Sequence, residues 1–244
     1  MKLLQIAGAS LCIGLIASNA WALSYIRSPN AEKGEFAVEY SGNRTFDRNN
    51  AKDNSAEHEF AVEYGLNSRT MLELETELEH EPNDTAKFTE LGMEARFQFF
   101  EQGENWLDSG ILLRYNVALE NQHADAVAIK GLLEKDIGNF TTQVNLGLEQ
   151  QFGQYSNPDG AEYSFLANTH YRMQKEFEPG IELQSQFGRS NTIGHFDQQE
   201  HYIGPAVHGK LFNNVKYEAA YLLGFSDAAS EGAGRVKVEY EMHF

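Results

Sequence analysis

Residues 71–80 read Met-Leu-Glu-Leu-Glu-Thr-Glu-Leu-Glu-His. Successive side chains of an extended chain point to opposite sides, so the leucines here share one face and the glutamates share the other. Alternation with a period of two is typical of a β-strand whose two faces meet different surroundings. This stretch is therefore predicted to be a strand with an apolar face and a row of carboxylates opposite it.

The same alternation continues along the rest of the chain. It predicts about twelve strands, an even number, each near the ~10 residues that a tilted membrane-crossing strand needs. Their approximate ranges are 35–40, 57–66, 72–79, 90–99, 107–117, 127–133, 140–148, 163–171, 181–187, 203–207, 215–223 and 236–244.

The connections between these strands are of two kinds. Tight turns are predicted at residues 66–68, 101–105, 138–139, 175–180 and 212–214. Longer polar stretches fall at 43–54, 81–86, 120–125, 153–160, 188–198 and 226–233. Short and long connections alternate, as periplasmic turns and external loops do in membrane barrels. A β-sandwich has no reason to keep this order, so the predicted fold is an all-β, closed antiparallel up-and-down transmembrane barrel.

The first residues have the pattern of an export signal. Lys2 is followed by an apolar run over residues 3–16 and by Ala-Trp-Ala at 20–22, which predicts a secretory signal peptide cleaved before Leu23. Cleavage removes Cys12, the only cysteine, so the mature chain has no thiol. We expect a signal peptide at 1–22, a periplasmic N-terminal segment at 23–32 and a barrel at 33–244.

Composition excludes several classes of protein. The formal net charge is −17, which argues against a nucleic-acid partner. Mean hydropathy is −0.49, and no long apolar run follows residue 22, so a helical membrane protein is excluded. A barrel agrees with these values, because its outward and inward residues average to a modest hydropathy.

The end of the chain carries a more specific pattern. Val236, Val238, Tyr240 and Met242 alternate along the last strand, and the chain stops at Phe244. This row resembles the C-terminal signature of bacterial outer-membrane barrels, which the barrel assembly machinery reads. With the leader and the strand pattern, the resemblance covers nearly the whole mature chain and is specific for the class, not for a subfamily. It implies a porin-like barrel of a Gram-negative outer membrane, surrounded by outer-membrane lipid and inserted by that machinery.

If the apolar face meets lipid, the opposite face lines the lumen. The residues expected to line it are Glu35, Glu39, Glu57, Glu59, Glu63, Glu73, Glu75, Glu77, Glu79, Glu90, Glu94, Arg96, Arg114, Arg172, Glu239 and Glu241. Carboxylates outnumber basic groups on this face, and dry burial of unpaired charges is costly, so a water-filled lumen is favoured. The resulting hypothesis is a passive diffusion channel for small solutes that favours cations.

Three alternatives remain open. Carboxylates and basic groups that form hydrogen-bonded ladders would fill a narrow barrel and leave it with a structural or loop-display role. An outer-membrane hydrolase is less favoured, because the His-x-Ser pair that outer-membrane phospholipases and deacylases share does not occur here. His195, Asp197, Glu200 and His201 have the residue types of a protease rim or a divalent cation site, but chance proximity in a polar loop explains them better. No catalytic residue, metal ligand or cofactor is therefore predicted.

Overall fold

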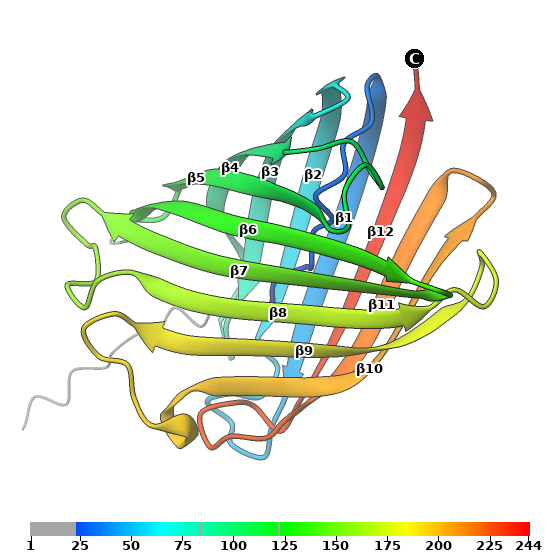
Figure 1. Ribbon diagram of the computed structural model, residues 1–244. Coiled ribbons are helices and arrows are strands. Elements are labelled where there is room, and N and C mark those ends of the chain that lie inside the picture. Colours follow the sequence, from blue (N-terminus) through cyan, green and yellow to red (C-terminus); the bar gives the residue numbers. More distant parts are fainter. Residues whose placement is uncertain (1–22, 83, 122) are drawn as a thin grey trace, which may run out of the picture.

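The computed structural model describes residues 23–82, 84–121 and 123–244, and its strands form one closed antiparallel barrel. Figure 1 shows the strands strongly tilted around a common lumen. The strands are β1 (Glu35–Phe46), β2 (Ala56–Asn67), β3 (Thr70–His80), β4 (Lys87–Gln98), β5 (Asp108–Ala118), β6 (Asp125–Ile137), β7 (Phe140–Phe152), β8 (Glu162–Tyr171), β9 (Glu178–Arg189), β10 (Glu200–Leu211), β11 (Val215–Gly224) and β12 (Gly232–His243). The prediction of an even-numbered, all-β barrel is confirmed, and the predicted signal peptide lies outside the described residues.

Each strand pairs with its neighbours in sequence, and β12 returns to pair with β1. The closing pairs run from Glu35 opposite His243 to Phe46 opposite Gly232. Closure leaves no strand edge with unpaired backbone groups, which is the requirement for a sheet that sits in lipid.

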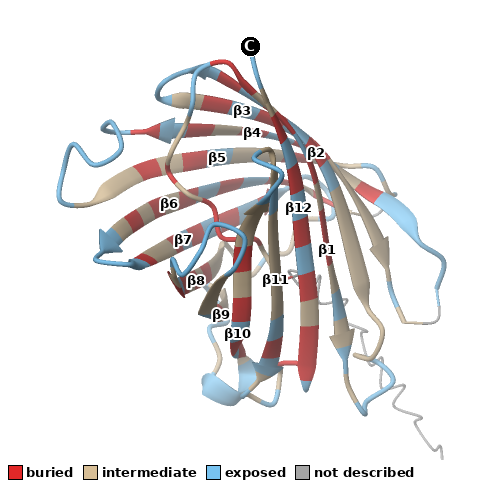
Figure 2. Cartoon of the chain, turned by 90° about the vertical axis from the view of Figure 1, so that its right-hand side faces the viewer, coloured by how far each residue is buried: buried red, intermediate tan, exposed pale blue. Residues whose placement is uncertain are grey.

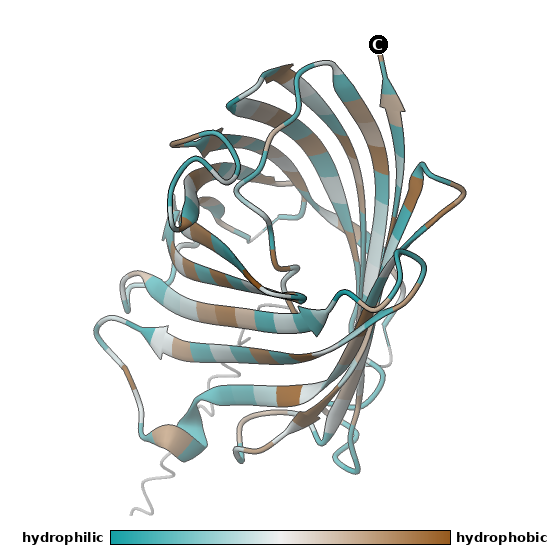
Figure 3. Cartoon of the chain, turned by 45° about the vertical axis from the view of Figure 1, so that its right-hand side comes forward, coloured by the Kyte–Doolittle hydropathy of each residue, from teal (hydrophilic) through white to brown (hydrophobic). Residues whose placement is uncertain are grey.

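The two faces of the wall differ as the alternation predicted. Large apolar side chains such as Val62, Leu72 and Leu74 are exposed on the outer face, whereas their neighbours Glu63, Glu73 and Glu75 are buried on the inner face. Buried and exposed residues alternate along the strands in Figure 2, and apolar and polar residues alternate in Figure 3. The buried part of this molecule is therefore mostly polar and lies inside the barrel.

The three shortest connections, at residues 68–69, 138–139 and 212–214, lie at one end of the barrel, and six connections of six to ten residues lie at the other. We call the first end the turn end; there β2 joins β3, β1 begins and β12 stops. We call the other end the loop end; residues 47–55 and 190–199 lie there. The long connections lie at the loop end as predicted, but the predicted tight turn at 101–105 is wrong: the connection between β4 and β5 covers residues 99–107 and is as long as several of the loops. Two further positions shift. β1 extends to Phe46, because Asn43 and Arg44 stay paired with β2 and β12 above the apolar part of the wall. The turn between β8 and β9 covers residues 172–177, because Pro179 and Gly180 pair with β10 instead of forming the turn.

Helical structure among the described residues is limited to a 3-10 turn at Phe196–Gln198 in a long loop. None of their helices has the length and apolar character needed to cross a membrane.

Candidate functional site

The N-terminal segment, residues 23–34, crosses the lumen from the loop end to the turn end. Leu23 packs with Tyr202, Leu222 and Ala229 near the loop end, and the Gly34 amide donates a 2.8 Å hydrogen bond to the Gly65 carbonyl at the turn end. Residues 23–32 were expected to lie outside the barrel, on the periplasmic side, and the structure differs. An extended chain of this length reaches roughly 35 Å, enough to cross a hydrocarbon core of ~30 Å, so a short segment spans the interior.

Arg27 is the most enclosed charge of this segment, with 6% of its surface exposed. Its Nη1 donates to Glu39 Oε2 at 2.9 Å and to Glu63 Oε1 at 3.2 Å. Its Nη2 donates to Glu73 Oε1 at 2.8 Å and lies 3.7 Å from Glu59 Oε1. We call Glu39, Glu59, Glu63 and Glu73 the glutamate cage. A guanidinium stays charged in proteins, so Arg27 supplies a permanent positive charge at the middle of the lumen.

The wall also binds the backbone of the N-terminal segment. Asn145 on β7 accepts a 2.7 Å hydrogen bond from the Arg27 amide and donates a 2.9 Å bond to the Arg27 carbonyl. The Gln98 side chain accepts from the Ala31 amide at 3.1 Å. The Tyr25 hydroxyl lies 2.9 Å from the carbonyl oxygens of Gly42 and Val236. Buried backbone groups need such partners, and these bonds hold the segment in one position.

Three of the four cage carboxylates have a second cationic partner. Lys237 pairs with Glu39 at 2.7 Å, Arg96 with Glu63 at 2.9 Å, and Arg114 with Glu59 at 2.9 Å. Glu73 differs: within the described part of the chain, Arg27 is its only ion-pair partner, and its Oε2 has no hydrogen-bond partner. The charge balance at Glu73 therefore depends on Arg27.

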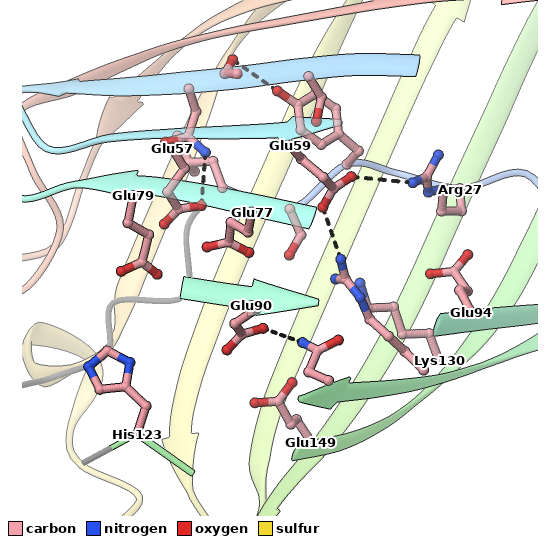
Figure 4. A pocket seen from close by; sticks show the side chains of 18 of the residues that line it. Arg27, Glu57, Glu59, Glu77, Glu79, Glu90, Glu94, His123, Lys130 and Glu149 are labelled. Atoms are coloured by element: carbon pink, nitrogen blue, oxygen red, sulfur yellow. Dashed lines mark hydrogen bonds and ion pairs between the residues drawn. The ribbon is translucent and has the colours of Figure 1, made fainter. Parts of the chain in front are cut away.

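A second acidic group lines a cavity of about 100 Å³ between the N-terminal segment and the wall toward the loop end (Figure 4). Glu57, Glu77 and Glu79 point into it, and their carboxylate oxygens lie within 4.8 Å of one another. We call these three residues the acidic vestibule. No ion pair joins any of them to a cation in the described ranges; Glu57 accepts only a long, 3.4 Å bond from Asn43. The cavity is large enough for several water molecules, which need about 10–15 Å³ each by this measure.

The structure places the predicted lumen residues as follows. All of them except Arg172 lie on strands with their side chains on the inner side of the wall. Glu73 and Glu75 are neutralised by Arg27 and Arg114, while Glu241 is neutralised by Lys210 and Lys216 near the turn end.

Arg172 corrects the expected set. It follows the last residue of β8, lies exposed in the turn and pairs with Asp136 at the end of β6. The strand pattern was extended one residue too far at this position, because the turn begins before the expected range 175–180.

Other inward groups were missed. Arg27 gave no signal, because no alternation surrounds it and its segment was placed outside the barrel. Glu149, Glu182 and Glu218 on β7, β9 and β11 also face inward. Each stands at the polar position of an alternating strand, so the period of two was sufficient to find them.

The remaining candidates lie apart from the lumen. The outer row of β12 carries Val236, Val238 and Tyr240, all exposed, and ends at the exposed Phe244. Both ring nitrogens of His201 have neutral partners, Ser185 at 2.9 Å and Gln199 at 3.1 Å, and the ring stacks on Phe196. Among the residues described, His195 and Asp197 in the loop and Glu200 at the start of β10 belong to no group of three metal-binding side chains.

Comparisons with solved structures agree with the fold. The chain is similar to an outer-membrane channel from Pseudomonas putida F1, with a TM-score of 0.62 and 11% identity over 89% of this chain and 97% of that one. It is similar to the KdgM porin (TM-score 0.57, 12% identity, 85% and 99% covered) and the NanC porin (TM-score 0.58, 8% identity, 84% and 100% covered). The fold is that of an outer-membrane channel barrel. No protein-family model matches the sequence, and the search of curated proteins found no match.

A glycine of the barrel wall leaves room for the N-terminal segment. A Cβ built on Gly65 would lie 1.8 Å from the carbonyl oxygen of Glu32, whereas one on Gly131 meets nothing closer than 4.0 Å. We expect Gly65→Val to displace the segment and to speed tryptic cleavage after Arg27. If the free energy that docks the N-terminal segment falls by about 1.4 kcal/mol, the population of undocked segment rises about tenfold. Mass spectrometry of the folded protein in detergent reads the cleavage, with Gly131→Ala as the control. Equal cleavage rates in Gly65→Val and the parent protein would contradict the docked position.

Proposed function

We propose that this protein is a passive outer-membrane channel for small solutes that favours cations, with a lumen narrowed by its own N-terminal segment. The fold supports a channel barrel, and the exposed apolar rows on the outer wall support a location in lipid. The predicted signal peptide and the exposed C-terminal row are consistent with export and with insertion by the barrel assembly machinery.

The acidic vestibule carries the cation preference. Its three carboxylates lie around a water-sized cavity at the loop end and form no ion pair with a described cation. A cleft lined by one sign of charge raises the local concentration of the opposite ion, and low-dielectric walls strengthen the effect. Deeper in the lumen the balance differs, because the glutamate cage is shared with Arg27, Lys237, Arg96 and Arg114. Selectivity is therefore assigned to the vestibule.

A structural, non-conducting barrel is the second candidate. The observation that favours it is the N-terminal segment, which occupies the lumen and forms hydrogen bonds with Asn145 on β7 and Gln98 on β4. The two candidates differ in a single measurable property, the conductance of the folded protein with and without this segment.

Selectivity is tested in planar bilayers. The mature protein and a variant that lacks residues 23–31 are compared under a KCl gradient, each with and without Glu57→Gln, Glu77→Gln and Glu79→Gln. We expect the deletion to raise conductance and the triple substitution to lower the potassium-to-chloride permeability ratio by about threefold or more, since a charge about 8 Å away contributes ~0.5 kcal/mol in water.

The control for this experiment is Glu101→Gln with Glu104→Gln, in an exposed turn outside the lumen. An unchanged permeability ratio in the vestibule variant would remove the selectivity assignment. A barrel that stays silent after the deletion would favour the structural candidate.

Lipid contact is tested on the outer wall. Leu74 lies near the middle of β3 with 48% of its surface exposed. An arginine at the bilayer midplane of a barrel costs about 2–4 kcal/mol. We expect Leu74→Arg to lower the free energy of unfolding in liposomes by that amount and Leu74→Ala to lower it much less, as read by denaturant titration. Equal stability of the two variants would place Leu74 outside the hydrocarbon layer.

A further inference from the structure

We propose that the glutamate cage is a binding site for the guanidinium group of a small solute, and that Arg27 occupies it as an internal ligand. The solute class is a small molecule that bears a guanidinium group; one with a primary ammonium group would bind more weakly. The inference deepens the proposed channel function by naming what the lumen recognises.

The cage belongs to the wall and not to the segment that fills it. Its carboxylates stand on β1, β2 and β3, which are neighbours in the sheet, and Glu63 is the paired partner of Glu73. Backbone pairing on both sides of each strand sets these positions. The carboxylates therefore keep their places when Arg27 leaves, as a binding site built on rigid elements requires.

Departure of Arg27 leaves one charge without a partner. Glu39, Glu59 and Glu63 keep Lys237, Arg114 and Arg96, whereas Glu73 has no other cation among the residues described. Glu73 is only 6% exposed, and its Oε2 already has no hydrogen-bond partner. An uncompensated buried carboxylate is costly, so the vacated cage favours capture of one further cation.

The arrangement of the oxygens selects the shape of that cation. One guanidinium nitrogen of Arg27 donates to Glu39 and Glu63, and the other donates to Glu73 and faces Glu59. A planar fork with separated donors matches these two pairs of oxygens. An ammonium group presents its donors from a single point, and a tetraalkylammonium ion presents none. Recognition should therefore follow the order guanidinium, primary ammonium, tetraalkylammonium.

The cage borders the cavity that the acidic vestibule lines. Arg27 and Glu59 line the same cavity as the acidic vestibule, so a cation attracted there meets the edge of the cage next. A solute that enters from this cavity competes with Arg27, and its binding releases the N-terminal segment from its central ion pairs.

The test uses the full mature chain with Arg27→Ala, refolded in detergent, and methylguanidinium as the probe. We expect millimolar methylguanidinium to raise the melting temperature of this variant in a saturable way, and tetramethylammonium at the same ionic strength to leave it unchanged. Binding should be at least about tenfold weaker in the parent protein, whose cage is filled, and in Arg27→Ala with Glu73→Gln, whose unshared carboxylate is gone. Arg27→Ala with Glu79→Gln is the matched control and should keep the effect.

If Arg27→Ala does not refold in the absence of an added cation, the refolding yield with each cation becomes the measurement. Rescue by methylguanidinium and not by tetramethylammonium supports the site, and absence of rescue overturns it. Equal melting shifts with the two cations, or with and without Glu73→Gln, also overturn it. This binding test does not depend on conductance, which the bilayer experiment measures separately. A barrel that binds methylguanidinium but does not conduct would refute the channel alone. A barrel that conducts but does not bind methylguanidinium would refute the binding site alone.

Discussion

The pairing of β1 with β12 closes the sheet, and the rest of the structure depends on this closure. Once every strand has two neighbours, each residue has only two directions, outward to an apolar surrounding or inward to a shared space. The chain places its acidic residues inward on strand after strand, and closure forces them together. The interior must then supply positive charge or water, and the structure contains both a set of inward Arg and Lys side chains and a cavity.

The basic side chains and the cavity lie at different depths of the lumen. Toward the middle, the carboxylates share Arg27, Arg96 and Lys237, and the charge is largely compensated. Toward the loop end, Glu57, Glu77 and Glu79 face the cavity without such partners in the described chain. A solute entering from the loops would first meet the carboxylates of the acidic vestibule and then the glutamate cage, in which Arg27 already supplies a positive charge.

The sequence predicted which residues face inward better than it predicted the ion pairs that these residues form in the lumen. Alternation along residues such as Leu72 to Glu79 determines which side chains face inward, because the period of two is a property of the strand itself. It does not determine how far a side chain reaches or which one it meets across the lumen. Glu73 and Glu79 therefore looked alike, although of the two only Glu73 has a cation among the described residues as an ion-pair partner. Arg172 was misplaced, because a pattern that averages over a strand is least reliable at its ends.

Arg27 was beyond this kind of reasoning. Its segment has no alternation, and its side-chain partners stand on three different strands, β1, β2 and β3. Asn145, which bonds to the Arg27 backbone, is more than a hundred residues away. Contacts of this kind depend on closed geometry and carry no local signature.

The Tyr25 hydroxyl has a consequence for the order of folding. The two carbonyls it touches belong to Gly42 and Val236, which are paired residues on the first and last strands. Its binding position is complete only after ends of the chain nearly two hundred residues apart have met, the slowest kind of contact to form. Tyr25 can therefore dock only on a closed seam, and its binding adds free energy to the one pair of neighbouring strands that no turn connects.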